Sequence, residues 1–332
     1  YAVPRVLNAA GFLGGLLTEA WIPADSVMGK LPVAALRRLR GRYHAELSSA
    51  KVLHFTLSSV GFEIRARLFK CNSRDPWSHT LARNRWFQRR GVAALKRLAP
   101  LLEMAGSRLT LFAYSYAALE LLRFAKQRGW RTILGQIDGG RRDEEIIEAE
   151  HRLHPEMKAS WQPAPPEYWR AWTDECALAD GIVVNSEWSS RLLIEAGIES
   201  KKLHVIPVAY EGTIEGRALV REYPEQFTAS RPLRILFLGA FVLRKGAAAV
   251  LGAIRLLQKE PVEFWIVGAT GVDVPAALRD SPKVKWIGPV SREGSSAYYR
   301  NADLFLFSTL SDCFGLTQVE ARGWKRPIIT TP

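Results

Sequence analysis

Short apolar runs alternate with amphipathic segments along the last third of the chain. Such runs, bounded by turn residues, predict buried strands, and the segments between them predict helices. The predicted strands are 234–239, 263–268, 284–288 and 303–308, and the predicted helices are 245–258, 274–279 and 292–300. Strands that alternate with helices indicate a parallel sheet covered on both faces.

The same alternation begins earlier, near residue 109. It predicts strands at 109–114, 132–136, 181–185 and 203–207, with helices at 115–127, 143–151, 168–179 and 186–196. Nearer the N-terminus, the pattern predicts a helix over 33–49, a strand over 52–57 and helices over 62–70 and 82–104. The fold class is therefore α/β, with doubly wound parallel sheets.

A polar, weakly patterned stretch separates the two alternating regions. We interpret it as a linker, which predicts an N-terminal Rossmann-like domain over 1–210, a linker over 211–231 and a C-terminal Rossmann-like domain over 232–332. The chain begins without Met or a signal-peptide pattern and ends in a strand-like run. We therefore expect a fragment that lacks the N-terminal strand and some C-terminal elements.

The charge of the chain is uneven. The formal net charge is +13, and residues 1–110 hold 18 Lys and Arg against 6 Asp and Glu. A solvated surface, an anionic membrane surface and nucleic acid could each explain this excess. The solvated surface is the simplest explanation, and peripheral contact with an anionic membrane comes next. No recognition motif accompanies the charge, so we expect no nucleic-acid partner.

The cysteine positions and the hydropathy of the chain argue against a disulfide-stabilised, Cys-zinc or membrane-spanning protein. The three cysteines, Cys71, Cys176 and Cys313, stand far apart, which excludes a disulfide framework or a Cys-based zinc site and fits a cytoplasmic protein. No run of about 20 apolar residues occurs that would predict a membrane-spanning helix.

The stretch from Asp312 to Glu320 carries the clearest chemistry. It follows a predicted strand, and a helix is predicted to start near Phe314 or Gly315. A helix start binds anions, because its first N–H groups lack partners and the helix dipole is positive there. A loop acid, a helix start and a helix acid suit a ligand that carries phosphate and hydroxyl groups.

Two further positions follow strands of the same predicted sheet. Arg244 and Lys245 come just after the strand 234–239 and could hold a diphosphate, although a solvated basic loop is an equal alternative. Pro289 and Val290 follow the strand 284–288, where backbone groups could hold a flat base.

The spacing of these pieces resembles a known family. Arg244-Lys245-Gly246, the strand 284–288 ending in Gly, and Asp312-x7-Glu320 together resemble the donor domain of retaining GT-B glycosyltransferases, glycosyltransferase family 4 (glycosyl transferases group 1). The resemblance covers about residues 232–332 strongly, extends to 175–187 and is weak over 1–108. It implies two Rossmann-like domains that face each other across a cleft, with the acceptor on the first and the nucleotide sugar on the second.

The resemblance also implies roles for individual residues. The donor diphosphate would be held by Arg244 and Lys245, the sugar would be contacted by the catalytic-site Asp312, and the ribose would be bound by Glu320. The remaining donor contacts would come from the backbone of Phe314, Gly315 and Leu316 and from Pro289 and Val290 at the base.

The implied reaction transfers a hexosyl group to an acceptor hydroxyl with retention of configuration. Fixed cations and a helix start would stabilise the leaving diphosphate, so no metal and no cofactor beyond the nucleotide sugar is expected. The acceptor would be a glycan, a lipid or a small molecule in carbohydrate biosynthesis. The expected location is cytoplasmic, with peripheral contact at the inner face of the membrane through residues 1–110.

Several positions depart from the family pattern. Ala240 stands where Arg is frequent, Asp312 replaces the more usual Glu, and Cys313 stands where Gly is common. The His that many members carry after the fourth strand is not identified here. Asp138 is a candidate for acceptor contact or catalysis, although an Asp in a glycine-rich turn is more often structural.

Two other classes stay open. One is a GT-B enzyme of different chemistry, such as a sugar-nucleotide epimerase or a phosphorylase. The other is a non-catalytic nucleotide-sugar-binding protein, which the Ala240 departure alone supports. An epimerase would act on the donor without an acceptor, and a phosphorylase would require a pyridoxal-phosphate lysine that the sequence does not identify.

Overall fold

The computed structural model describes residues 2–23, 26, 42–68, 76–104, 106, 108–159, 161–210 and 212–331. Backbone contacts divide the chain into two compact units. Unit 1 comprises Tyr1–Gly135 and Ala164–Val183, and unit 2 comprises Gln136–Pro163 and Val184–Pro332. The domain boundaries drawn from the sequence stay a prediction.

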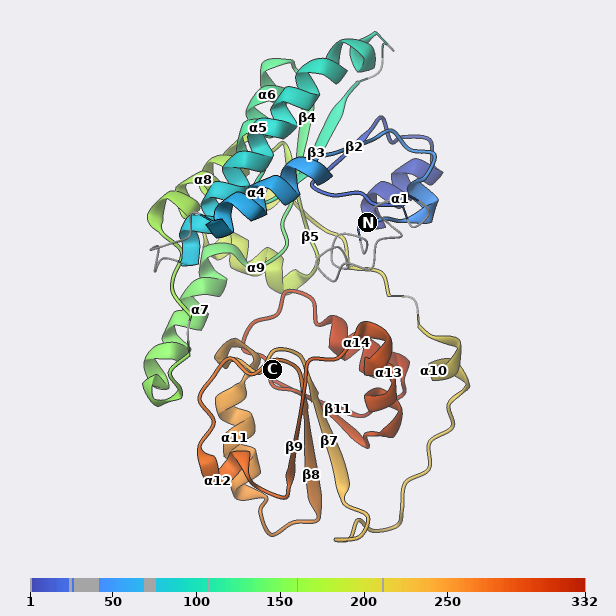
Figure 1. Cartoon of the computed structure of the whole chain (residues 1–332), viewed down its shortest axis with the longest axis vertical. Coiled ribbons are helices and arrows are strands. Elements are labelled where there is room, and N and C mark those ends of the chain that lie inside the picture. Colours follow the sequence, from blue (N-terminus) through green and yellow to red (C-terminus); the bar gives the residue numbers. More distant parts are fainter. Residues whose placement is uncertain are drawn as a thin grey trace. The chain divides into compact units, whose positions relative to one another are not determined.

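Unit 2 is built on a five-stranded parallel sheet, drawn in the lower part of Figure 1. Its strands are β7 (Leu233–Leu238), β8 (Val262–Val267), β9 (Val284–Gly288), β10 (Leu304–Phe307) and β11 (Ile328–Thr330). Their order across the sheet is β11-β10-β7-β8-β9, and all neighbours are parallel. The strand order reverses between β7 and β10, and such a switch point is where open α/β sheets bind ligands.

Helices cover both faces of this sheet. On one face lie α11 (Ala247–Leu256) and α12 (Ala276–Arg279), and on the other lie α13 (Arg292–Asn301) and α14 (Leu316–Gly323) (Figure 1). A separate apolar cluster fills each side, with Phe264 and Ile254 in the first and Tyr299 and Trp324 in the second. Strands buried on both faces explain why the predicted runs are continuously apolar.

Part of unit 2 comes from the middle of the chain. The elements are α7 (Gly140–Leu153), η2 (Pro155–Met157), α9 (Glu187–Glu195), η3 (Ser200–Lys202), β6 (Leu203–Val205) and α10 (Ile214–Ala218). Met157 joins the apolar cluster beside α11, and its carbonyl accepts a hydrogen bond of 2.7 Å from the Asp273 N–H. The hydroxyl of Ser186 caps α9 by accepting a 3.1 Å bond from the Ser189 N–H.

The stretch predicted as a linker belongs to unit 2, where Arg221 is one of several residues that hold it. The guanidinium of Arg221 donates bonds of 3.1 to 3.2 Å to the carbonyls of Trp324, Tyr299 and Arg300. These carbonyls lie at the C-terminal ends of α13 and α14, where a cation is favoured by the helix dipole.

Unit 1 contains two sets of parallel strands. One set is β3 (Thr110–Tyr114), β4 (Arg131–Gly135) and β5 (Gly181–Val184), which pair in the order β3-β4-β5. The other is the pair β1 (Leu16–Thr18) and β2 (Val52–His54). Its helices are α1 (Ala2–Ala9), η1 (Ala45–Leu47), α4 (Thr56–Leu68), α5 (Pro76–Glu103), α6 (Leu119–Gln127) and α8 (Pro166–Leu178).

Several predicted boundaries are wrong, and one predicted helix falls mostly outside the described residues. The strand over 52–57 ends at His54, because the Thr56 hydroxyl bonds the backbone of Trp21 and α4 starts there. The helix over 245–258 starts only at Ala247, after the left-handed Gly246. The helix over 33–49 falls mostly outside the described residues, and its described end contains the 3-10 helix η1.

The helix predicted over 115–127 also starts late, at Leu119, and a buried carboxylate explains why. Glu175 of α8 is 1% exposed and accepts hydrogen bonds from the N–H groups of Tyr116, Ala118 and Leu119 at 2.7, 2.8 and 3.0 Å. It thus supplies the cap that α6 lacks locally and holds Tyr116 at a φ of 74°. Burial outweighs these bonds and raises the pKa of Glu175 to about 6.

We predict that Glu175 makes stability depend on pH. Because its folded-state pKa is raised above the ordinary 4.5, its stabilising contribution is complete below about pH 4.5 and is lost as the pH rises through about 6. The free energy of unfolding of the wild type, relative to Glu175→Gln, should fall by about 2 kcal/mol between about pH 4 and pH 7. Urea unfolding at several pH values measures this difference. The exposed Glu167 on the same helix serves as the control, since Glu167→Gln should show no such slope.

Candidate functional site

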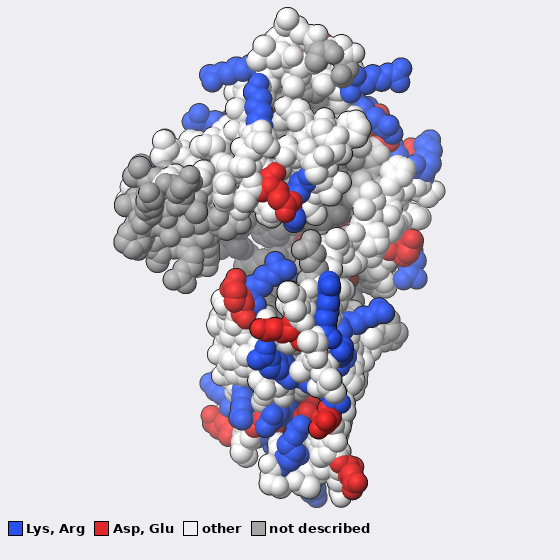
Figure 2. Space-filling view, turned by 90° about the vertical axis from the view of Figure 1, so that its right-hand side faces the viewer, with Lys and Arg blue, Asp and Glu red and all other residues white. Residues whose placement is uncertain are grey.

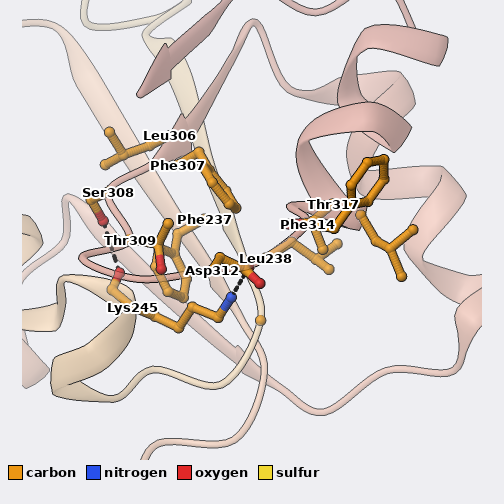
Figure 3. Close-up of a pocket in the computed structure, with 12 residues that line it drawn as sticks. Phe237, Leu238, Lys245, Leu306, Phe307, Ser308, Thr309, Asp312, Phe314 and Thr317 are labelled. Atoms are coloured by element: carbon orange, nitrogen blue, oxygen red, sulfur yellow. Dashed lines mark hydrogen bonds and ion pairs between the residues drawn. The ribbon is translucent and has the colours of Figure 1, made fainter. Parts of the chain in front are cut away.

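A cavity of about 250 Å³ opens at the C-terminal ends of β7 and β10, beside the switch point of the sheet. Figure 3 shows the residues that line it, which come from both strands, the turn after β7, and the loop and helix after β10. They are Phe237, Leu238, Gly239, Lys245, Leu306, Phe307, Ser308, Thr309, Asp312, Phe314, Leu316 and Thr317. Only two of these side chains are charged, so the cavity is mostly apolar.

The two charged side chains, Lys245 and Asp312, form an ion pair with each other (Figure 3). The Lys245 ammonium also lies 5.6 Å from the centre of the Phe307 ring. Burial lowers the pKa of Lys245, and the carboxylate of Asp312 opposes this lowering. The two charges therefore balance each other inside a cavity in which either alone would be costly.

The turn that carries Lys245 is the 3-10 helix η4 (Leu243–Lys245), and it lies directly against the loop after β10. The Lys245 carbonyl accepts a 3.0 Å bond from the Ser308 hydroxyl, and the Arg244 carbonyl accepts bonds from the Leu310 N–H and the Thr309 hydroxyl. A Cβ on Gly246 would lie 1.9 Å from the Ser308 carbonyl oxygen. Only glycine allows this approach, and its φ of 76° also favours glycine.

The start of α14 forms another wall of the cavity. Gly315 precedes the helix, and a Cβ there would lie 2.6 Å from the Phe307 ring. Its neighbours Phe314 and Leu316 line the cavity together with Thr317. The positive end of the helix dipole and the Lys245 ammonium therefore face the same cavity, a combination that suits an anionic group.

Glu320 lies on α14 but does not line the cavity. Its carboxylate accepts a 3.0 Å hydrogen bond from the hydroxyl of Tyr299, which is 1% exposed. Burial and this carboxylate raise the pKa of Tyr299, so its hydroxyl stays a donor at neutral pH. One oxygen of Glu320 is thus held by the protein, which fixes the orientation of the carboxylate.

Other predicted residues also lie outside the cavity. The guanidinium of Arg244 donates a 2.9 Å bond to the Ser311 carbonyl, and its side chain is not part of the lining. Pro289 and Val290 are exposed residues after β9 and do not line the cavity either. The structure therefore gathers Lys245, Asp312 and the start of α14 around one cavity, and the roles of all the predicted site residues stay predictions.

Asp138 has a structural role at the start of α7. Its carboxylate accepts hydrogen bonds from the Gln136 side-chain amide at 2.8 Å and from the Gly140 N–H at 2.9 Å. This is the glycine-rich turn that the sequence favours for it. A role for Asp138 in acceptor contact or catalysis stays a prediction.

Sequence reasoning missed a third carboxylate, Asp143, in the first turn of α7. It hydrogen-bonds Ser311 and is close enough to Arg244 and Asp312 to interact electrostatically with both. Burial is the main cause that raises the pKa of Asp143. The only sequence signal was its place in an acidic segment, which is ordinary for the N-terminal turn of a helix.

Cys313, which follows Asp312, is 6% exposed. Burial raises the pKa of its thiol to about 12, so it stays protonated at neutral pH and is a poor nucleophile. Among the described residues, no group of three or more His, Cys, Asp or Glu side chains is arranged to hold a metal ion.

The C-terminal part of the chain matches a known family. Residues 232–332 match the family described as Glycosyl transferases group 1. The chain is also 28% identical, over 152 residues, to an uncharacterized 41.2 kDa protein in the cps region of Klebsiella pneumoniae. That match spans 45% of this chain and only 42% of the relative.

Solved structures match almost the whole chain at low identity. Sucrose-phosphate synthase from Thermosynechococcus elongatus has a TM-score of 0.55 at 16% identity, covering 99% of this chain and 73% of its own. Anabaena HepE in complex with UDP has a TM-score of 0.52 at 14% identity. The apo lipopolysaccharide outer core galactosyltransferase WaaB has a TM-score of 0.51 at 12% identity. Each match covers 95% of this chain and 79% of the matched chain. At such identities the likeness shows the fold, which is the α/β GT-B fold that the sequence predicted.

We predict that the site tolerates no side chain at position 246. Gly246→Ala should lower the free energy of unfolding by at least about 2 kcal/mol, because the methyl group collides with backbone and the left-handed φ becomes strained. Gly252→Ala in α11 is the matched control, because a Cβ there meets open space. This substitution should stabilise the helix by up to about 1 kcal/mol. Urea unfolding of both variants tests this, and an unchanged Gly246→Ala midpoint would contradict it.

Proposed function

We propose that this chain carries out sugar-nucleotide-dependent glycosyl transfer. A hexosyl group moves from a nucleoside-diphosphate sugar to an acceptor hydroxyl, with retention of configuration and without a metal ion. The observation that carries the proposal is the Lys245–Asp312 ion pair beside the start of α14, in the cavity at the sheet's switch point. The family match over residues 232–332 supports it.

Donor binding exchanges the partners of this ion pair. The diphosphate takes the Lys245 ammonium and the N–H groups at the start of α14. Asp312 is then free to accept hydrogen bonds from the sugar hydroxyls. Glu320, whose other oxygen is held by Tyr299, accepts from the ribose hydroxyls, and Pro289 and Val290 flank the base.

Arg244 contributes to this arrangement in two ways. Its backbone carbonyl and its guanidinium both bond the loop that leads to Asp312, which positions the carboxylate. Although this guanidinium does not line the cavity, it adds positive charge near the diphosphate when the donor binds. It is thus a positioning residue as well as a source of electrostatic potential.

The chemical step breaks the bond between the anomeric carbon and the diphosphate oxygen. The departing oxygen gains negative charge, which Lys245 and the helix start stabilise more strongly than they do in the ground state. The acceptor hydroxyl attacks the oxocarbenium-like sugar from the face that the diphosphate leaves. Its proton passes to the leaving phosphate oxygen, so charge and atoms balance without a metal ion.

The comparisons suggest which donors to test first. HepE, which shares the fold, was solved with UDP, and WaaB is a galactosyltransferase by name. UDP-hexoses are therefore the first candidates for this chain, with a glycan, lipid or small-molecule hydroxyl as acceptor.

Peripheral contact between residues 1–110 and an anionic membrane is part of the same proposal. The charge excess of that region supports it. The proposed location is the cytoplasmic face of the membrane. Among the described residues, no helix combines the length and hydropathy needed to cross a bilayer.

We predict that Lys245→Ala lowers kcat/KM for the donor by about 100-fold, because a buried charge-assisted contact to the leaving group is lost. A panel of radiolabelled UDP-hexoses, assayed for transfer to added acceptors and for hydrolysis, measures this. Asp312→Asn should lower turnover while leaving UDP binding largely intact, since its predicted partner is the sugar.

The control for these variants is Lys259→Ala, an exposed lysine after α11 that should change neither parameter. Thermal shift with UDP separates binding from turnover, because a ligand stabilises only the state that it binds. Binding without turnover on any donor would favour the non-catalytic alternative, and conversion of donor without acceptor would favour an epimerase. No binding of any nucleotide sugar would contradict the proposal.

A further inference from the structure

Helix α4 in unit 1 presents a narrow apolar stripe to solvent. Leu57, Ile64 and Leu68 are 76%, 53% and 72% exposed. Ile64 and Leu68 follow Leu57 by seven and eleven residues, and the exposed Gly61 follows it by four. At this spacing all four residues share one face of the helix. Single exposed aliphatic residues are ordinary, but an aligned set on one helix face is a candidate interaction surface.

The opposite face of α4 is anchored to α5, which runs beside it in Figure 1. The Phe62 ring lies 5.4 Å from the Trp86 ring and 5.8 Å from the His79 ring, and Glu63 contacts His79 at 3.3 Å. The stripe of α4 therefore points away from α5 and from the core of unit 1.

Helix α5, against which α4 packs, carries exposed positive charge. Its exposed cations are Arg85, Arg89, Arg90, Lys96 and Arg97. Within the described part of the chain none of the five takes part in an ion pair, and the only acid in the helix is Glu103 at its end, which bonds Arg128. Arg90 and Arg97 follow Trp86 by four and eleven residues, so they lie on the face of α5 against which α4 packs.

We propose that the α4 stripe and the five α5 cations form one docking surface for an anionic phospholipid membrane. The aliphatic side chains enter the boundary between headgroups and acyl chains, and the cations bind lipid phosphates. This inference rests on the membrane contact proposed above but is independent of glycosyl transfer.

Charge favours a membrane over a second copy of the chain. A symmetric dimer through this face would bring five cations against five cations, which is destabilising. An anionic bilayer instead complements both the charge and the apolar stripe. Elsewhere the charge pattern differs: in Figure 2 the lower part of the drawn face, formed by the β7–β11 sheet and its helices, carries acidic and basic side chains interspersed.

Co-flotation of the 332-residue chain with vesicles tests the proposal. We expect binding to vesicles that contain phosphatidylglycerol and much weaker binding to phosphatidylcholine alone. The triple variant Leu57→Gln, Ile64→Gln, Leu68→Gln should lower the partition coefficient by about tenfold or more, because the stripe no longer enters the bilayer. The triple variant Arg89→Gln, Lys96→Gln, Arg97→Gln should lower it by about 100-fold, and added salt should reduce the wild-type value similarly.

Matched controls come from exposed residues of unit 2. Leu256→Gln controls for loss of an exposed leucine, and the triple variant Arg255→Gln, Lys259→Gln, Lys201→Gln controls for loss of three cations. Neither should change vesicle binding, apart from a small effect of net charge. All substituted side chains are exposed, so thermal melting should show that the variants stay folded.

Several outcomes would overturn the proposal. Wild-type protein that does not bind anionic vesicles would overturn it. So would control variants that lose vesicle binding as strongly as the test variants. A stripe variant that binds like the wild type would remove the apolar part of the surface. Sedimentation velocity that shows a dimer abolished by the stripe variant, without vesicle binding, would assign the stripe to a second copy. Because no nucleotide sugar is present, these results stand apart from the transfer assay.

Discussion

The candidate donor site depends on one close backbone approach. At Gly246 the turn after β7 comes so near the loop after β10 that a methyl group would lie 1.9 Å from the Ser308 carbonyl oxygen. The Ser308 hydroxyl and the Leu310 N–H then bond the carbonyls of Lys245 and Arg244. Two segments more than 60 residues apart are locked together, and the positions of the Lys245 ammonium and the Asp312 carboxylate follow from this lock.

The ion pair inside the cavity has a consequence for ligand recognition. Even a partly buried pair costs desolvation energy, which the attraction between its partners offsets. A ligand that offers an anion to Lys245 and hydroxyl groups to Asp312 replaces each partner with another of suitable chemistry. A simple anion would leave Asp312 unpaired, and a simple polyol would leave Lys245 unpaired. Under the proposed function, the pair therefore favours ligands that carry both groups, as a nucleotide sugar does.

The surroundings of the site hold the loop before Asp312 from several directions. Arg244 bonds the Ser311 carbonyl, Asp143 bonds Ser311 from α7, and the Trp188 indole N–H lies 3.5 Å from the Ser311 hydroxyl. Ser311 is 1% exposed, so these contacts form away from water, where hydrogen bonds are stronger. Side chains outside the cavity thus set its geometry. Unit 1 has a comparable buried support in Glu175, which orders the turn after β3.

The sequence by itself determined the fold class and most strands. Runs such as 263–268 are apolar at every position but the first, and only a sheet covered on both faces buries such a run. It also singled out Lys245, Asp312 and the start of α14, because their spacing after strands of one parallel sheet places them at one edge. The sequence pattern also indicates the Ser186 cap of α9, since its hydrogen bond spans only three residues.

Only the tertiary structure decided which predicted residues meet. Arg244 bonds a loop carbonyl and Glu320 bonds Tyr299, so neither lines the cavity, although both stand at the expected spacing. Asp143 reaches Ser311 from a helix that begins more than 160 residues earlier in the chain. Such contacts depend on the direction of side chains across packed elements, which local sequence patterns do not encode. The start of a helix can also depend on a tertiary contact: α6 begins where Glu175, from another helix, accepts hydrogen bonds from its first N–H groups.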